Sequence, residues 1–192
     1  DQIVTDNDIG TIEEIKRCCT INGVKSENIE ERELKSQFRC KGSTGYLSWL
    51  DDMLQIRETA NHILDTKEYD FRVVDSPDEL DQLIIDRNED NKARLVAGYY
   101  KEWISKDDDT KFDFELSNTF KKKWNMNKKS KPWAIRRDSI SEIGCIHTCQ
   151  GLEFDYIGVI IGTDLRFENG NVITDLSQNA NSDKTSLVHT KA

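Results

Sequence analysis

Two apolar runs near the end of the chain have the length and composition of β-strands. The sequence IGCI begins at residue 143 and YIGVIIG occupies residues 156–162, and both runs are rich in β-branched side chains. Such runs suit central strands of a parallel sheet that helices cover on both faces. The polar insert between them, residues 147–155, is expected to turn the chain between two buried strands. Ligands of open α/β sheets bind at such strand ends, although an ordinary solvated turn gives the same pattern.

The remaining pattern alternates between helices and strands. Apolar residues recur at helical spacing in three segments, each bounded by capping residues or glycine. Between them lie short apolar runs of strand length, and Asn169-Gly170 is the preferred dipeptide of a two-residue hairpin turn. The predicted helices run from Thr11 to Gly23, onward from Ser43, and from Ser76-Pro77, and the predicted strands lie at residues 34–40, 71–75 and 93–99.

The strand, helix and strand predicted between residues 71 and 99 form the parallel crossover of a doubly wound sheet. The sequence therefore predicts an α/β fold, with a mainly parallel sheet flanked by helices. The expected organisation is a linker at residues 1–10, one lobe at residues 11–175 with a charged insertion at residues 101–138, and a polar tail at residues 176–192.

Composition places limits on the class of protein. The chain has 192 residues, of which 36% are hydrophobic, so it can bury a core as one domain. Its net charge of −9 argues against a generic nucleic-acid coat protein, which would be basic. The sequence has no apolar run long enough to span a bilayer and no signal-peptide pattern. Five cysteines do not suggest a disulfide framework, and a reducing cytoplasm fits best.

A basic run at residues 121–137 contains two tryptophans and no acidic residue. Lysines neutralise phosphates and indoles stack on nucleobases, so this run is a candidate nucleic-acid contact. The alternative is a solvated insertion whose lysines pair with the acidic residues that precede it. The candidate contact residues are Lys121, Lys122, Lys123, Trp124, Lys128, Lys129 and Lys131.

Three stretches of the chain resemble one known family. The sequence HTCQGLEFDYIGVIIG, starting at His147, is similar to motif V of superfamily 1 helicases, and closely to the version in the Schlafen group 3-like DNA/RNA helicase domain family. SQFRCKGSTGYLSWLDDML, starting at Ser36, and the segment from Phe71 to Tyr100 follow the same family in order. The resemblance implies the second, C-terminal RecA-like lobe of a nucleic-acid-dependent ATPase.

The resemblance also implies roles for individual residues. Arg39, in the position of motif IV, would contact the γ-phosphate of ATP, as a bidentate guanidinium can. A surface arginine paired with a carboxylate is the alternative. Gln2 would be the end of motif III and sense the γ-phosphate. In motif V, Glu153 would accept a hydrogen bond from the ribose, Gln150 and Gly151 would line the cleft between lobes, and His147 and Thr148 would face the nucleic-acid backbone.

Several motor parts are missing from the sequence. It contains no glycine-rich phosphate loop with its lysine and no motif VI with an arginine finger. The chain is therefore expected to be a piece of a motor that does not hydrolyse ATP alone. ATP and Mg²⁺ are expected only with the full-length protein, and the expected partners are DNA or RNA and the missing N-terminal RecA-like lobe.

Three other functions compete with the motor reading. The first is a non-catalytic module that keeps the fold and binds nucleic acid or a protein. The second is an independent hydrolase that uses Glu153 and Asp155 as an acid–base pair, although two carboxylates in a turn are common. The third is a zinc site, since Cys145, His147 and Cys149 would share one face of a strand. Zinc needs four ligands, and the sequence does not supply the rest, so no metal site is expected.

Overall fold

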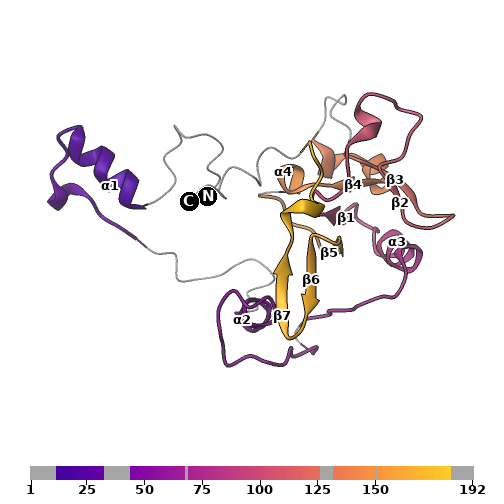
Figure 1. Cartoon of the computed structure of the whole chain (residues 1–192), viewed down its shortest axis with the longest axis horizontal. Coiled ribbons are helices and arrows are strands. Elements are labelled where there is room, and N and C mark those ends of the chain that lie inside the picture. Colours follow the sequence, from indigo (N-terminus) through magenta and orange to yellow (C-terminus); the bar gives the residue numbers. More distant parts are fainter. Residues whose placement is uncertain (1–11, 33–43, 68, 126–131, 150, 183–192) are drawn as a thin grey trace. The chain divides into compact units, whose positions relative to one another are not determined.

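The structure is a computed structural model that describes residues 12–32, 44–67, 69–125, 132–149 and 151–182 (Figure 1). The chain forms two compact units. One contains Asp1–Gly42 and Lys184–Ala192, and the other contains Ser43–Asp183. The second unit holds the sheet and is called the sheet unit below.

In the first unit, the helix α1 (Ile12–Ile21) ends as the sequence predicts. Gly23 has a φ of +80°, which a residue with a side chain rarely adopts. Its N–H donates to Thr20 O at 3.0 Å, and the Val24 N–H donates to Cys19 O at 2.9 Å, which is the paired closure of a glycine-terminated helix. A single 3₁₀ turn, η1 (Ser26–Asn28), follows.

The sheet unit is built on a five-stranded sheet in the order β2-β3-β4-β1-β5. Every neighbouring pair is parallel except β2 with β3. This confirms the predicted α/β fold with a mainly parallel sheet. The strands are β1 (Ala93–Ala97), β2 (Phe114–Glu115), β3 (Lys121–Trp124), β4 (Glu142–Gly144) and β5 (Tyr156–Ile160).

The charged insertion predicted at residues 101–138 contributes directly to this sheet, because it supplies β2 and β3. Short 3₁₀ turns connect its parts. Phe114, Phe120 and Trp124 from the insertion are buried, and Phe114 packs edge-on against Trp124 with ring centroids 4.6 Å apart. The 3₁₀ turns are η3 (Ile104–Lys106), η4 (Trp133–Ile135) and η5 (Arg137–Ser141).

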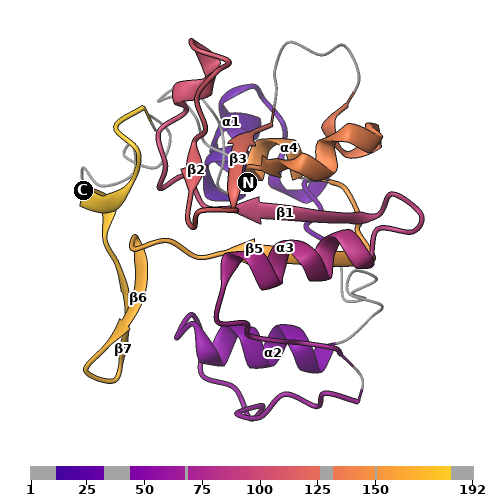
Figure 2. The ribbon, with the colours of Figure 1, turned by 90° about the vertical axis from the view of Figure 1, so that its right-hand side faces the viewer.

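Two helices cover opposite faces of the sheet (Figure 2). The helix α3 (Pro77–Asp86) begins as predicted, with Pro77 in the first turn and the Ser76 hydroxyl accepting from Glu79 N at 3.1 Å. It packs on β1 and β5 through Leu80 and Ile84. The short helix α4 (Ile146–Cys149) lies against β1 on the other face.

The strand predicted at residues 71–75 is not formed. Val73 is 84% exposed, and no ladder pairs this segment. Phe71 instead packs edge-on against Trp49 of α2 (Thr44–Met53), with ring centroids 5.0 Å apart. This aromatic contact holds the segment against α2, outside the sheet. The predicted crossover is therefore only half present, as α3 followed by β1.

The two strands on either side of the polar insert differ in burial. The strand β4 ends at Gly144 and the buried run ends at Cys145, because the exposed Ile146 already belongs to α4. β5 is the edge strand among the residues that the structure describes, and Ile157 and Val159 are 47% and 55% exposed. The prediction of burial on both faces is correct for β4 and wrong for β5. α4 covers β1 and leaves this face of β5 open.

The hairpin at the end of the chain is confirmed. β6 (Leu165–Glu168) and β7 (Asn171–Thr174) pair through a turn in which Asn169 and Gly170 both have positive φ, 51° and 84°. After η6 (Leu176–Gln178), Ala180 is buried and its N–H donates to Tyr99 O at 3.0 Å. The start of the predicted polar tail is thus fastened to the loop that follows β1.

Replacement of Gly158 by alanine should destabilise the sheet unit by about 1–3 kcal/mol, as overpacking of a filled core does. A Cβ at Gly158 would lie 2.6 Å from Leu95 Cδ2 and 3.0 Å from Ile84 Cγ1. Urea unfolding of Gly158→Ala gives the measurement. The control is Gly45→Ala in α2, where the nearest atom would be 3.8 Å away. A Gly158→Ala midpoint equal to wild type would contradict this packing.

Candidate functional site: a crossover segment over the sheet

Residues 145–155, which contain the polar insert, cross over the sheet from one end to the other. They leave the carboxyl end of β4, form α4, and reach the amino end of β5, which lies two places away in the sheet with β1 between them. Asp155 N and Tyr156 N both donate to Lys92 O, at 2.9 and 3.3 Å, directly before β1 begins. The prediction of a turn between two strands at one sheet edge is therefore wrong. Residues 145–155 are called the crossover segment below.

Three predicted motif V residues lie exposed on the crossover segment. His147 is exposed on α4, and Gly151 and Glu153 are exposed between α4 and β5. Gly151 has a φ of +78° and space around it, so a glycine is needed here for the backbone conformation and not for close packing. The crossover segment therefore presents an imidazole, a glycine with positive φ and a carboxylate to solvent.

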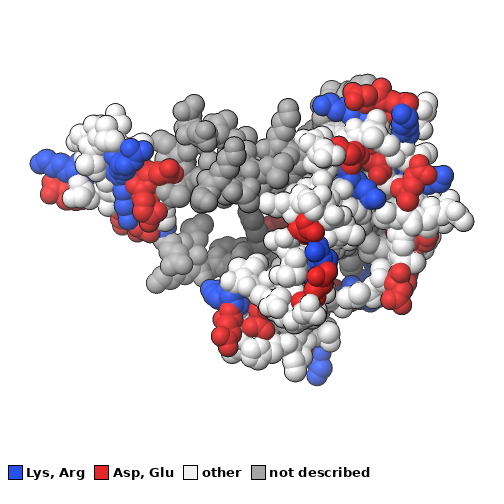
Figure 3. Space-filling model, in the orientation of Figure 1, with Lys and Arg blue, Asp and Glu red and all other residues white. Residues whose placement is uncertain are grey.

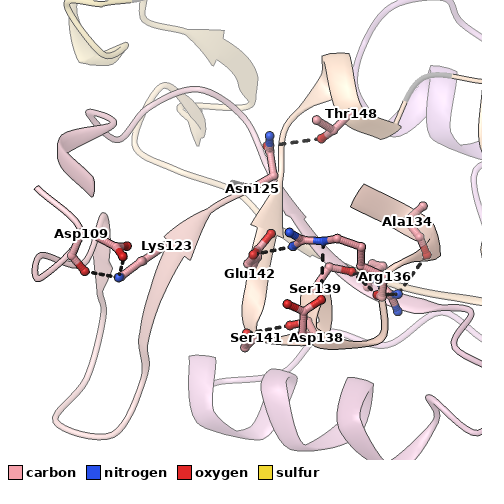
Figure 4. Close-up of polar contacts among 11 residues, drawn as sticks. Asp109, Lys123, Asn125, Ala134, Arg136, Asp138, Ser139, Ser141, Glu142 and Thr148 are labelled. Carbon is pink, nitrogen blue, oxygen red and sulfur yellow. Dashed lines mark hydrogen bonds and ion pairs between the residues drawn. The ribbon is translucent and has the colours of Figure 1, made fainter. Parts of the chain in front are cut away.

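Thr148, for which the resemblance implies a contact to the nucleic-acid backbone, is half-buried. Its hydroxyl donates to Cys145 O at 2.9 Å and lies 3.3 Å from Asn125 Oδ1 (Figure 4). It also accepts from Cys145 N at 3.1 Å. The side chain is thus engaged with the start of α4 and the end of β3.

The two cysteines of the crossover segment flank Thr148. Cys145 is buried and Cys149 is half-buried, and the Thr148 hydroxyl lies 3.8 and 3.9 Å from their sulfur atoms. Because residues 146–149 are helical, Cys145, His147 and Cys149 do not share a face as they would on a strand. Burial raises the pKa of the Cys149 thiol to about 11, since a buried thiolate is poorly solvated.

Trp133 supports the crossover segment from beneath. Its ring packs edge-on against Phe154, with centroids 6.1 Å apart. A Cβ on Gly144 would lie 2.5 Å from this ring and 2.8 Å from Cys149 Sγ, so only glycine fits at the end of β4. The distance between the crossover segment and the sheet is therefore set by the contacts among Trp133, Gly144 and Cys149.

Arg94, fully buried in β1, holds the segment that carries Trp133. Its guanidinium donates to the carbonyl oxygens of Ala134 and Arg136, at 3.0 and 2.9 Å. Burial and the neighbouring Arg136 lower the pKa of Arg94, although arginine stays charged in proteins. Arg136 in turn pairs with Glu142 at 2.5 Å. The remaining partners of Arg94 are Asn88, Asn91, Ala93 and Ser139.

The lysines of β3 pair with carboxylates. Lys121 lies 3.3 Å from Glu115, and Lys123 lies 2.8 Å from Asp109 (Figure 4), so these lysines pair with acidic residues of the insertion, although the insertion itself is part of the sheet. Lys122 is buried and lies 2.8 Å from Asp81 of α3. On the face in Figure 3, basic and acidic residues of the sheet unit are interspersed. The β3 lysines thus already have anionic partners.

Trp124 is fully buried. Its ring packs against Phe114 and Tyr99, and its indole N–H donates to Lys101 O at 3.0 Å. A buried indole offers no face to a nucleobase. Six other predicted site residues lie outside the described residues: Gln2, Arg39, Lys128, Lys129, Lys131 and Gln150.

Sequence reasoning missed the residues that position the crossover segment. Asn125 and Trp133 lie outside the three stretches that resemble the family, and Arg94 lies within one of them without a predicted role. Each of the three acts through contacts with residues far away in sequence. One signal was present: an arginine in the middle of the apolar strand ARLVA needs buried polar partners. Two of those partners, the carbonyl oxygens of Ala134 and Arg136, lie 40 and 42 residues away, so the sequence did not identify them.

Comparison with protein families decides the relationship of the chain. The family model described as Schlafen group 3, DNA/RNA helicase domain matches residues 1–192, which is the whole chain. The chain belongs to this family. A relative, an uncharacterised protein of Saccharomyces cerevisiae, is 25% identical over 153 residues, covering 72% of this chain and 33% of the yeast protein. The chain thus spans about a third of that relative, and no solved structure matches.

Two further observations bear on the class of site in this Schlafen group 3 domain. Within the described ranges, no helix is long and apolar enough to cross a membrane. Among the same residues, no three histidine, cysteine, aspartate or glutamate side chains converge as metal ligands would.

Replacement of Arg94 by lysine should destabilise the sheet unit by about 3 kcal/mol, because one ammonium cannot reach the carbonyl, hydroxyl and amide partners that the guanidinium fork serves. Thermal unfolding provides the measurement. The control is Arg72→Lys, an exposed bidentate pair with Asp70 at 2.8 and 3.0 Å, which should leave the midpoint unchanged. Equal midpoints for both variants would show that Arg94 does not hold the segment.

Cys149 should react with iodoacetamide about a hundredfold more slowly at pH 8 than N-acetylcysteine in the same tube. The thiolate is the reactive form, and a pKa of about 11 leaves little of it at that pH. The rate should rise with pH up to about 11. Mass spectrometry of the peptide containing Cys149 follows the reaction. Alkylation as fast as that of the free thiol would contradict the buried setting.

Proposed function

We propose that this chain is the second RecA-like lobe of a nucleic-acid-dependent ATPase. It contributes motifs IV and V to an ATP cleft that is completed by another RecA-like lobe, and it is inactive alone. The observation that carries the proposal is the crossover segment. It presents His147, Gly151 and Glu153 to solvent over a parallel α/β sheet, in a chain matched throughout by a DNA/RNA helicase domain model.

Glu153 is the nucleotide contact in this proposal. A carboxylate accepts hydrogen bonds from ribose hydroxyls, and Glu153 is exposed directly before two held residues: Phe154 packs against Trp133, and Asp155 N donates to Lys92 O. This support restricts the positions that the carboxylate can take, so less conformational freedom is lost when the nucleotide binds. Arg39 and Gln150 keep their motif roles as part of the proposal.

His147 is the proposed contact to the nucleic-acid backbone. It is exposed on α4, near the carboxyl end of β4, and an imidazole N–H can donate to a phosphate oxygen. The paired lysines of β3 are secondary in this scheme, because a phosphate would have to displace Glu115 or Asp109 to reach them.

Mg²⁺ does not fit the described residues of this chain. They bring no cluster of carboxylates together as hard-cation ligands. In the proposed enzyme the ion is held by the other lobe, and this chain supplies groups that contact the nucleotide and the nucleic acid.

In the full-length protein, Glu153→Ala should raise the KM for ATP by about 10- to 100-fold, the effect of losing a hydrogen bond to a charged acceptor. Steady-state hydrolysis with ATP and with 2′,3′-dideoxy-ATP gives the measurement. Wild type should prefer ATP, and Glu153→Ala should lose most of that preference, because the contact to the ribose is gone.

Glu168→Ala is the matched control, since Glu168 is also an exposed glutamate and pairs with Arg166 on the hairpin at 2.6 Å. It should retain both KM and the preference for ATP. If Glu153→Ala behaved like Glu168→Ala, the motif V assignment would be wrong. Retained binding of single-stranded DNA or RNA without ATP turnover in wild type would instead favour a binding module.

A further inference from the structure

We propose that Asn125 and Thr148 form a polar clamp that positions α4, and that Thr148 acts through this clamp and not by touching the nucleic-acid backbone. The clamp links the end of the basic strand β3 to the start of the crossover segment (Figure 4). Its structural part stands on contacts alone, and its consequence for turnover rests on the proposed function.

Asn125 is built into the sheet. It follows β3 directly, its N–H donates to Ile143 O at 2.9 Å, and it is only 3% exposed. Its side-chain Oδ1 points at α4, where it accepts from Cys145 N at 3.3 Å and from the Thr148 hydroxyl at 3.3 Å. A buried carboxamide oxygen with two donors from one helix start fixes that helix against the sheet.

Thr148 closes the clamp from the other side. It is the third residue of α4, and its oxygen accepts from the N–H of Cys145, the residue before the helix. This is the reciprocal contact of a capping box, with a hydroxyl in place of the usual carboxylate. The one N–H of Cys145 is therefore shared by two side-chain acceptors, Thr148 Oγ1 from the first turn of α4 and Asn125 Oδ1 from the residue after β3.

The hydrogen count of the Thr148 hydroxyl decides its role. A hydroxyl has one proton to donate, and two acceptors compete for it: Cys145 O at 2.9 Å and Asn125 Oδ1 at 3.3 Å. A phosphate oxygen also needs a donor. Thr148 can donate to a phosphate only if its hydroxyl proton leaves both Cys145 O and Asn125 Oδ1. We therefore assign it as a positioning residue. The exposed His147 beside it remains the group that faces a ligand.

The first arm of the test does not depend on ATPase activity. Hydrogen exchange of the peptide containing residues 145–149 is measured by mass spectrometry in the full-length protein. Asn125→Leu and Thr148→Val should each speed exchange by about tenfold, the loss expected for one helix cap. Thr148→Ser keeps the hydroxyl and should exchange like wild type. Wild-type exchange in Asn125→Leu, or fast exchange in Thr148→Ser, would overturn the clamp.

The second arm measures turnover stimulated by oligo-dT and the dissociation constant of oligo-dT. Each of Asn125→Leu and Thr148→Val should lower the stimulated kcat by about five- to tenfold, and the double variant should lower it no further, because both residues serve one contact. The dissociation constant should change by less than about twofold. A weaker affinity in Thr148→Val alone, with effects that multiply in the double variant, would mean direct phosphate contact and overturn the proposal.

Thr20→Val is the control for both arms. The Thr20 hydroxyl donates to Lys16 O at 2.9 Å inside α1, the same length as the Thr148 bond to Cys145 O, but it belongs to the other unit. This variant should match wild type throughout. If wild type shows no turnover stimulated by nucleic acid, the proposed function fails, and the exchange arm still decides the clamp.

Discussion

The buried guanidinium of Arg94 is the interaction on which the rest of the sheet unit depends. It stands on the central strand β1 and binds the carbonyl oxygens of Ala134 and Arg136. Those bonds place η4, and with it Trp133, which sets the positions of Gly144 and Phe154. A charge without water is expensive to bury, so its partners must all be present at once. The contacts of Arg94 therefore support the crossover segment through η4 and Trp133.

Ion pairs also limit how much the three lysines of β3 can contribute to phosphate binding. The chain carries a net charge of −9, and the three β3 lysines already face Glu115, Asp81 and Asp109. A lysine that exchanges a carboxylate for a phosphate gains much less than one that binds phosphate from water. Counterion release therefore contributes less than the number of lysines suggests.

The sequence pattern correctly predicted the helix ends and the hairpin that are determined by neighbouring residues. The start of α3 follows from Ser76-Pro77, the end of α1 from Gly23, and the last hairpin from Asn169-Gly170. The predictions were wrong where a contact with a residue distant in sequence determines the secondary structure. Residues 71–75 have a strand's composition, but Phe71 packs on Trp49. Ile146 looked like the end of a strand, yet the Asn125 and Thr148 contacts begin a helix there. The motif V resemblance covers the crossover segment but does not give its direction across the sheet.

That direction changes what the segment can do. A turn would place His147 and Glu153 at one sheet edge and commit both to one ligand. A crossover carries them toward opposite ends of β1, five residues long and therefore roughly 16 Å, so one short segment can serve two ligands. In the proposed motor, nucleic acid lies at the α4 end and nucleotide at the β5 end. α4 is capped by Asn125, which follows β3, and is supported by Trp133, so a displacement at the His147 end moves this helix as a unit. Coupling between two sites needs such an element.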